Sequence, residues 1–554
     1  MLRVRWLGRV AYRDAHALQR GLFERSPDDH LLLLEHPHVY TLGVRADLGN
    51  VLVPPADVGA ELVRTDRGGD VTYHGPGQLV GYPILTVPGK RGGGMADTVA
   101  YVRSVEQLVI DTLRSLGLDD VGRLDDFPGV WVAPGSDRPR KIAAIGVKLA
   151  RGRSMHGFAL NVAPDLAMFG HIVPCGIADK AVTSLAAEGI DVEMREVVEA
   201  LVPLAVERWG AGGWERSDVV WRERADDLSP FSRGEGPGAA ETSVRVSGRL
   251  AQAGVTERVE LRDRKPDWMK ARVRHTPELA QVRRTVRDLG LVTVCEEAGC
   301  PNLSECWSDG TATFMLNGER CTRACGFCLV DTRKPEAVDP GEPERVAEAV
   351  ERMGLDFAVL TTVARDDLPD GGASTFAETI RAIRRRRPDC RVETLISDCK
   401  GDPDALDVIF SARPDVLNHN VETVPRLQRA ARPSASYARS LAVLARAADA
   451  GLTTKSGLVL GMGETFDEVV AVLADLRSVG VEIVTAGQYL RPTANHLPVA
   501  RWWTPDEFAA LREAGLALGL AHVEADPLTR SSHHAKSAAD AAGAVASSVS
   551  VTPG

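Results

Sequence analysis

The chain has 554 residues and a formal net charge of −10 at pH 7, with 44% hydrophobic and 26% charged residues. Because a single core rarely grows beyond about 250–300 residues, this length predicts more than one domain. The dispersed acidic balance argues against a nucleic-acid partner, and no apolar run approaches the roughly 20 residues of a membrane span. The first residues contain no apolar stretch of signal-peptide length, so we expect a cytoplasmic protein in a reducing compartment.

Residues 1–215 alternate helical and strand patterns and predict a first body with a mixed α/β sheet and long loops. Helices are expected at Tyr12–Glu24 and Asp97–Leu116. The expected strands are Leu31–Glu35, Leu79–Leu85, Val130–Ala133, Ile142–Leu149 and Phe158–Val162.

A change in composition separates this body from the next. Residues 229–254 are rich in Gly, Ser and Pro and poor in aromatic residues, which is typical of a linker. We therefore place a linker at 216–259, with one short strand expected around Ser243–Val246. The small and polar residues 537–554 predict a disordered tail. Residues 260–536 then form the second body.

The second body alternates strand-like and helix-like segments, which is the pattern of βα units around a parallel sheet, open or closed into a barrel. The expected strands are Phe357–Thr362, Arg391–Ile396, Val416–Asn420, Thr453–Leu460 and Ile483–Leu490. The expected helices are Gly372–Arg387, Asp402–Ser411, Tyr437–Ala450 and Phe466–Val479. Such barrels place their chemistry at the carboxyl ends of the strands, where the motifs of this body lie.

Six of the nine cysteines lie between residues 295 and 328, in two triplets. The first triplet is Cys295, Cys300 and Cys306, and the second is Cys321, Cys325 and Cys328. Three thiolates can hold three irons of a four-iron cluster and leave the fourth iron open for a cofactor, a substrate or another side chain. A disulfide framework suits small secreted domains, and a structural zinc site uses four closed ligands. The pattern therefore favours two [4Fe-4S] clusters.

The second triplet, with spacing CX3CX2C, resembles the signature of the radical S-adenosylmethionine (SAM) superfamily. The resemblance implies that S-adenosyl-L-methionine binds the open iron. It also implies that one electron, from a donor such as ferredoxin or flavodoxin, leads to a 5′-deoxyadenosyl radical. Glycines near strand ends allow a backbone to approach a ligand closely. The candidate cofactor-binding residues are Gly371, Gly372, Lys455, Gly461 and Glu464.

Further motifs make the second body similar to the lipoyl synthase family over about residues 260–536. They are CEEAGCPNLSECW, CTRACGFC, VARDDLPDGGA, HNVETVPRL, KSGLVLGMGET, QYLRPT and TRSSHHA. The resemblance implies that Ser532 completes the cluster of the first triplet. It also implies that this auxiliary cluster is consumed as the source of two sulfurs, for C6 and C8 of an octanoyl chain. The departures from the family pattern are Gly326, Leu329, Thr362, Ser397, Cys399 and, where Tyr is usual, His533.

Two other interpretations of the second body stay open. An iron–sulfur or zinc scaffold that binds lipoyl domains would explain the cysteines without catalysis, and an iron content of about eight per chain would argue for two clusters instead. A different sulfur-inserting radical enzyme, similar to biotin synthase, would share the second triplet. The first triplet and the motifs of the first body argue against that alternative.

Three patches of the first body carry a second resemblance. They are RGGDVTYHGPGQ, KIAAIGV, and HGFALN followed by VPCGI. Together they resemble the octanoyltransferases related to lipoate-protein ligases, over roughly residues 1–215. The resemblance implies that Cys175 takes octanoate from acyl carrier protein as a thioester, with Lys141 as its acid/base partner. The candidate substrate-binding residues are Arg67, Gly68, Gly69, Asp70, Val71, Thr72, Tyr73, His74, Ala144, Ile145, Gly146, His156, Gly157 and Phe158.

The two resemblances together imply a lipoyl(octanoyl) transferase fused to a lipoyl synthase. The two halves would act in turn on one lysine of the lipoyl domains of 2-oxoacid dehydrogenases and of the glycine cleavage H protein. An ATP-dependent ligase is the nearest competitor for the first half, and catalysis by only one half is a further alternative. The expected fold is α/β, with a mixed-sheet domain like those of biotin and lipoate ligases followed by a partial (β/α) radical SAM barrel.

Overall fold

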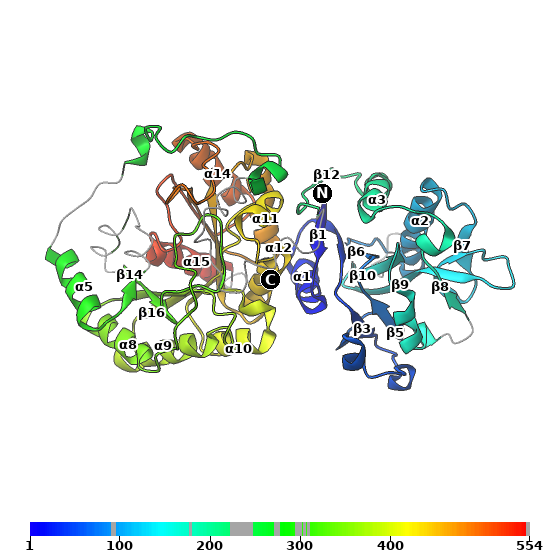
Figure 1. The fold of residues 1–554 in the computed structure, drawn as a ribbon, viewed down its shortest axis with the longest axis horizontal. Helices are drawn as coiled ribbons and strands as arrows, with labels where there is room; N and C mark the ends of the chain where they lie inside the picture. Colours follow the sequence, from blue (N-terminus) through cyan, green and yellow to red (C-terminus); the bar gives the residue numbers. More distant parts are fainter. Residues whose placement is uncertain are drawn as a thin grey trace. The chain divides into compact units, whose positions relative to one another are not determined.

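The computed structural model describes residues 1–89, 96–176, 180–221, 248–270, 277–293, 302, 306 and 311–549 (Figure 1). The chain divides into two compact units, Met1–Trp221 and Arg222–Gly554. Both units combine helices with a sheet, which confirms the predicted α/β class. Among the described residues, no helix is both long and apolar enough to cross a membrane.

The N-terminal unit is built on a large mixed sheet with the strand order β12-β1-β2-β6-β10-β9-β8-β7, and β11 pairs with β9. Helices α2 and α3 pack on one face of this sheet. Leu31 and Leu33 of β2 contact this helical layer because alternate side chains of a strand point to the same face. The strands are β1 (Leu2–Arg9), β2 (Asp29–Glu35), β6 (Gln78–Ile84), β7 (Val121–Leu124), β8 (Phe127–Val132), β9 (Arg140–Ala150), β10 (Arg153–Asn161), β11 (Ala181–Val182) and β12 (Trp214–Arg216). The helices are α1 (Tyr12–Arg25), α2 (Thr98–Ser115) and α3 (Met194–Trp209).

A second, small sheet of the N-terminal unit has the order β4-β3-β5. Its strands are β3 (Val39–Leu42), β4 (Glu61–Arg64) and β5 (Val71–His74). Val71 and Tyr73 point into a local core that also contains Phe169. The other two side chains of β5 therefore point to the opposite face.

The N-terminal unit extends beyond the expected boundary at residue 215. Strand β12 pairs with β1, and the Val219 N–H donates to the Trp6 carbonyl at 2.9 Å. The ring of Trp221 stacks on that of Trp6 with the centroids 4.1 Å apart. The sequence boundary was too early because a lone aromatic residue after a short strand gives no periodic signal.

The C-terminal unit contains a sheet with the order β13-β14-β15-β16-β17-β18-β19-β20. All neighbours are parallel except β13, which is antiparallel to β14. The strands are β13 (Val292–Thr293), β14 (Thr311–Leu316), β15 (Phe357–Thr362), β16 (Arg391–Leu395), β17 (Val416–Asn418), β18 (Thr453–Leu460), β19 (Ile483–Gln488) and β20 (His522–Ala525). The helices are α5 (Pro277–Asp288), α8 (Glu342–Met353), α9 (Ala373–Arg386), α10 (Pro403–Ser411), α11 (Gln428–Ala431), α12 (Tyr437–Asp449), α13 (Phe466–Ser478), α14 (Pro505–Ala517) and α15 (Ala535–Val549). This βα series confirms the predicted architecture.

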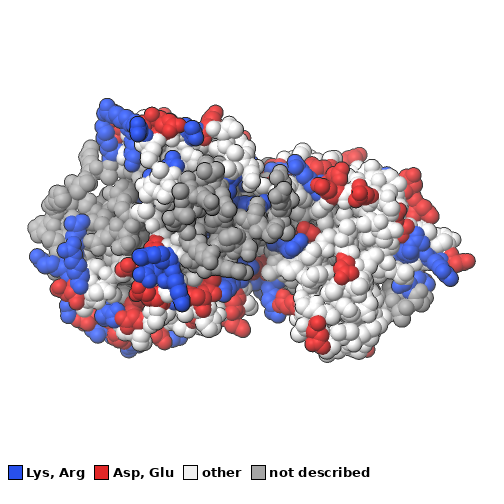
Figure 2. All heavy atoms as spheres, viewed as in Figure 1, with Lys and Arg blue, Asp and Glu red and all other residues white. Residues whose placement is uncertain are grey.

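Helices α8, α9 and α10 share one core with the strands β14 to β17. On the surface of this layer, basic and acidic side chains lie next to one another, as the face drawn in Figure 2 also shows. The basic end of α9 is paired in this way: Arg386 contacts Glu351 at 2.9 Å, and Arg385 forms an ion pair with Glu344. These basic residues at the end of α9 therefore belong to ion pairs with α8.

The expected disordered tail is wrong for residues 537–549, which form most of helix α15. Ala538 and Ala542 are buried against Val416 and Ile483, the first residues of β17 and β19. Small side chains carry little hydrophobic signal in the sequence, although they let a helix approach a sheet closely. Residues 550–554 lie outside the described residues.

The expected linker is also shorter than predicted. Residues 222–247, including the strand expected around Ser243–Val246, lie outside the described residues. From residue 248 the chain packs on the C-terminal unit, where Leu250 and Ala253 are buried. The Val259 N–H donates to the Val499 carbonyl at 2.7 Å. Residues 248–259 therefore belong to the second unit rather than to a free linker.

Candidate active sites

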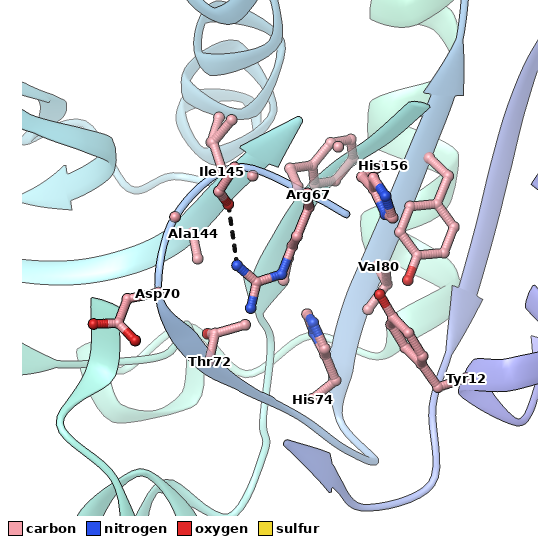
Figure 3. Close-up of a pocket in the computed structure, with 16 residues that line it drawn as sticks. Tyr12, Arg67, Asp70, Thr72, His74, Val80, Ala144, Ile145 and His156 are labelled. Carbon is pink, nitrogen blue, oxygen red and sulfur yellow. Dashed lines mark hydrogen bonds between the residues drawn. The ribbon is translucent and has the colours of Figure 1, made fainter. Parts of the chain in front are cut away.

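The N-terminal unit contains a pocket between the small sheet and the strands β9 and β10 (Figure 3). All predicted substrate-binding residues line it except Val71 and Tyr73, which belong to the core of the small sheet. The alternation of β5 explains this difference, because Thr72 and His74 point the other way. The lining residues that the sequence did not predict are Tyr12, Val80, Tyr82 and Ala159.

Arg67 fixes the glycine-rich loop at the edge of this pocket. Its guanidinium donates to the Thr41 carbonyl at 2.6 Å, to the Thr41 hydroxyl at 2.8 Å and to the Gly68 carbonyl at 3.1 Å. Gly157 of β10 also lines the pocket, and a Cβ atom there would come within 2.2 Å of the Gly81 carbonyl oxygen. A larger residue at position 157 would push β10 away from β6.

Three histidines around the pocket, His36, His74 and His156, are buried and uncharged at neutral pH. Burial lowers the pKa of His156 and that of His36 to about 4, and it lowers the pKa of His74 well below its ordinary value. His156 Nε2 lies 2.8 Å from Asp66 Oδ1, and hydrogen bonds from His156 and His16 hold the pKa of the Asp66 carboxyl well below its ordinary value. The Asp66 carboxylate orients His156 without charging it, so His156 presents a neutral ring to the pocket.

Lys141 lies on β9 and is 8% exposed. Its Nζ atom lies 4.9 Å from the centroid of the buried Trp131 ring, over the face of the ring. Strand β11 runs parallel to β9 there, with Val182 opposite Lys141. The stretch of chain that follows Cys175 therefore returns directly beside Lys141.

The backbone of Cys175 belongs to a short 3-10 helix, Pro174–Gly176, and its side chain lies outside what the structure describes. This turn is held at the pocket wall. The Val173 N–H donates to the Asn50 carbonyl at 2.8 Å, and Asn50 Nδ2 donates to Asp70 Oδ2 at 2.6 Å. Because Asp70 lines the pocket, the turn that carries Cys175 borders it. The nucleophilic role of Cys175 stays a prediction.

In the C-terminal unit, the second cysteine triplet lies on the loop that follows the carboxyl end of β14. Backbone hydrogen bonds tie this loop to its surroundings: Thr322 N to the Ala364 carbonyl at 2.9 Å, and Gly326 N to the Ala431 carbonyl at 2.8 Å. A Cβ atom on Gly326 would lie 2.8 Å from Leu497 Cγ. Glycine at position 326, one of the departures from the family pattern, therefore leaves room for Leu497 to pack against this loop.

The thiols of the second triplet fit a metal cluster. Burial, together with the charge of the neighbouring thiolates, raises the pKa of Cys325 to about 11 and that of Cys328 to about 12. Three thiols that oppose one another's ionisation gain from bound iron, because metal ligation requires and stabilises the thiolates. Cys321 is buried in the same way, and burial raises its pKa.

Arg323, between the first two cysteines of this triplet, braces the loop. It is buried and donates to both oxygens of Asp366 at 2.7 Å and to Asp398 at 2.6 Å. Asp398 comes from the loop after β16, so one guanidinium links the ends of neighbouring strands. The two carboxylates hold the pKa of Arg323 well above its ordinary value despite its burial.

Part of the first triplet can be placed. Cys295 and Cys300 lie outside the described residues, whereas Cys306 is half-buried and its N–H donates to the Asn302 carbonyl at 3.0 Å. Asn302 Nδ2 in turn donates to the Leu528 carbonyl at 2.7 Å. This contact links the turn that carries Cys306 to the segment that leads into the RSS motif, and the ligand role of Ser532 stays a prediction.

The RSS motif is anchored on both sides of Ser532. Asn420 Nδ2 donates to the Ser531 hydroxyl at 2.7 Å. His533 is buried, and its ring stacks on that of His534 with the centroids 3.8 Å apart. His533, which stands where Tyr is usual, is therefore a buried ring packed against His534.

The predicted cofactor-binding residues occupy different environments. Gly371 and Gly372 have φ values of 61° and 88° and lead from β15 into α9, a turn that only glycine adopts easily. Lys455 is fully buried, with Nζ 3.0 Å from both carboxylate oxygens of Glu393. The Glu464 carboxylate accepts N–H groups of Gly461, Met462 and Trp503, the last at 2.9 Å. Lys455 and Glu464 therefore bind other groups of the protein in this structure. Their roles in cofactor binding stay predictions.

Comparison with known proteins agrees with both resemblances. The lipoyl protein ligase A/B catalytic domain family matches residues 11–203, and the radical SAM superfamily matches residues 317–476. Over 273 residues the chain is 57% identical to a lipoyl synthase of Rubrobacter xylanophilus and 54% identical to one of Mycolicibacterium smegmatis. Each alignment covers 49% of this chain, and they cover 85% and 87% of the two relatives. A bipartite lipoate protein ligase structure from Thermoplasma acidophilum is 20% identical and covers 40% of this chain and 87% of its own, with a TM-score of 0.32.

The chain therefore joins two kinds of catalytic domain. Its N-terminal unit carries a catalytic domain of the lipoyl protein ligase A/B type. Through its C-terminal unit, the chain belongs to the lipoyl synthase family.

Proposed function

We propose that the chain performs two consecutive steps on one lysine of a lipoyl domain. The N-terminal unit transfers an octanoyl group from acyl carrier protein to that lysine, and the C-terminal unit inserts sulfur at C6 and C8. The presence of both domain types on one chain carries this proposal. Joining the two units raises the local concentration of the second site around the octanoylated product.

The transfer step uses two residues of the N-terminal unit. Lys141 accepts the proton of the Cys175 thiol, and the thiolate attacks the carbonyl carbon of the octanoyl thioester. A new C–S bond forms, the bond to the carrier breaks, and the carrier thiolate takes the proton back from Lys141. Lys141 then accepts a proton from the lysine of the lipoyl domain, whose amine displaces Cys175 from the acyl group. The Cys175 thiolate leaves and is reprotonated by Lys141.

The pocket suits an acyl chain of this kind. Val80, Ile145 and Phe158 contribute apolar surface, and the buried histidines contribute no charge. Because the acyl group of a thioester is already activated for transfer, the reaction needs no ATP.

For the sulfur-insertion step, Cys321, Cys325 and Cys328 would hold one [4Fe-4S] cluster. The other cluster would be held by Cys295, Cys300, Cys306 and Ser532. When bound, the first cluster with S-adenosyl-L-methionine supplies hydrogen abstraction from an unactivated carbon, and the second supplies sulfur. The chain's own contribution is to hold these ligands in place: Arg323 braces the loop of the second triplet, and Asn302 ties Cys306 to the segment before Ser532.

The partners follow from these two reactions. The acyl acceptors are lipoyl domains of 2-oxoacid dehydrogenases and of the glycine cleavage H protein, and the electron donor is a ferredoxin or flavodoxin. Cysteine thiols and iron–sulfur clusters need a reducing compartment, which supports a cytoplasmic location.

The test uses the full chain with octanoyl carrier thioester and a lipoyl domain. An octanoyl adduct on Cys175, seen by intact mass and absent in Cys175→Ser, supports the transfer step. Cys321→Ala is expected to leave octanoyl transfer intact and to abolish sulfur insertion. A strict requirement for ATP, or full transfer by Cys175→Ser, would overturn the transferase assignment.

A further inference from the structure

We propose that Trp131 is a positioning residue for Lys141: the face of its indole ring stabilises the lysine ammonium and thereby favours the thiolate of Cys175. The inference rests on the transfer reaction proposed above. It adds a residue that belongs to none of the three sequence patches.

The contact geometry is that of a cation–π pair. Lys141 Nζ lies 4.9 Å from the centroid of the Trp131 ring. This distance is within the range of about 6 Å over which a cation is attracted to an aromatic face, and Trp is the strongest partner for it. The ring of Trp131 is fully buried and Lys141 is 8% exposed, so solvent screens the contact little.

The surrounding backbone fixes both partners. Trp131 on β8 and Lys141 on β9 are directly opposite each other, next to a register shift that begins at Val130. The indole Nε1–H donates to the Phe127 carbonyl at 3.0 Å, which sets the orientation of the ring. Gly129 leaves room for the lysine stem, because a Cβ atom there would lie 3.2 Å from Lys141 Cε.

An aromatic partner has a chemical advantage at this position. The proposed reaction needs Lys141 to alternate between amine and ammonium. A ring face stabilises the cation but cannot accept its proton, so the proton remains available to the thiolate or to the leaving group. Trp131 therefore favours the Cys175 thiolate and the Lys141 ammonium over the thiol and the amine, while the proton can still transfer between the two groups.

A neighbouring pair provides a matched control. Phe127 lies on the same strand as Trp131 and contacts it edge-on, with the ring centroids 6.1 Å apart. The cation over the ring of Phe127 is Lys180 rather than Lys141, with Lys180 Nζ 5.7 Å from the ring centroid. Phe127→Leu thus removes an aromatic ring from the same cluster but not the ring that faces Lys141.

The experiment measures alkylation of Cys175 by iodoacetamide in the full chain across pH, read by peptide mass. We expect Trp131→Leu to move the midpoint of this profile up by about one pH unit and to slow alkylation at neutral pH by about tenfold. Trp131→Phe is expected to give an intermediate midpoint, and Phe127→Leu the wild-type one. If circular dichroism shows that Trp131→Leu is unfolded, the test rests on Trp131→Phe. A wild-type midpoint in Trp131→Phe would then overturn the inference.

Failure of this inference is distinct from failure of the transfer reaction. A wild-type alkylation profile in both Trp131 variants, with normal octanoylation of Cys175, overturns the role of Trp131 alone. Octanoyl transfer by Cys175→Ser would instead remove the reaction on which the inference depends.

Discussion

Acidification is expected to destabilise the N-terminal unit through the histidines around its pocket. The folded unit holds the pKa of His36 and that of His156 at about 4, against 6.5 ordinarily, because both are buried. The unfolded chain therefore binds more protons as the pH falls below 6.5. The stabilisation from these two neutral side chains is fully present above pH 6.5 and is lost as the pH falls toward 4.

The size of the effect follows from these values. Between pH 7 and pH 5 each of the two histidines costs about 2 kcal/mol of unfolding free energy, so the pair costs about 4 kcal/mol. Burial also lowers the pKa of His30 and of His74 well below the ordinary value, which adds to the loss in the same direction. Total stabilities of domains are about 5–15 kcal/mol, so the unit is expected to lose a large part of its stability by pH 5.

Hydrogen exchange in the full chain measures this effect locally. Peptides from β2 and β10 report opening of the N-terminal unit once the intrinsic exchange rates are corrected for pH. In a matched variant, His36→Gln, the pH slope should fall by about 1.4 kcal/mol per pH unit below pH 6. Constant protection between pH 7 and pH 5, or an unchanged slope in His36→Gln, would refute the assignment of neutral buried histidines.

Three further substitutions test the packing of the two sites. Gly157→Ala is expected to destabilise the N-terminal unit by about 3 kcal/mol or more in urea unfolding, because its Cβ would lie 2.2 Å from a carbonyl oxygen of β6. Asn302→Ala removes the bond to the Leu528 carbonyl, so iron of the first triplet should be lost to a chelator faster than in the wild type. Lys455→Met leaves the buried Glu393 unpaired and should cost the C-terminal unit about 3–5 kcal/mol.

Each of these expectations has a control. Gly135 has open space around its Cα atom, so Gly135→Ala should leave stability nearly unchanged. Equal iron release from the wild type and from Asn302→Ala would show that the contact with the segment before Ser532 does not hold the first triplet. Adding Glu393→Gln to Lys455→Met should recover much of the loss, and a double variant as unstable as the single one would contradict the ion-pair explanation.

The sequence predicted the βα order of the C-terminal unit well because its strands are buried on both faces. Phe357–Thr362 and Thr453–Leu460 have the same bounds in the structure as in the prediction. Phe357–Thr362 begins with four consecutive apolar residues, the pattern of a strand that is buried on both faces. Strand β14 was not predicted, because its six residues stand alone between two cysteine-rich segments of the sequence. Helix α15 was missed because its buried stripe consists of alanines, which resemble a disordered composition.

The candidate sites show the same division between local and long-range information. Motifs predicted most of the pocket lining, because glycine-rich patches mark where a backbone approaches a ligand. Tyr12 and Tyr82 could not be predicted, since only the tertiary fold brings helix α1 and strand β6 to that wall. The pairing of Lys455 with Glu393, 62 residues away, likewise depends on the sheet order, which places β18 and β16 on either side of β17.

The central claim is that one chain both octanoylates a lipoyl domain and converts that octanoyl group. The most direct measurement is the mass of an apo lipoyl domain after anaerobic incubation with the reconstituted full chain, octanoyl carrier thioester, S-adenosyl-L-methionine and reductant, without ATP. We expect the lipoyl domain to gain an octanoyl group that carries two added sulfurs. A lipoyl domain that stays unmodified without ATP, or that gains an octanoyl group without sulfur, would contradict the claim.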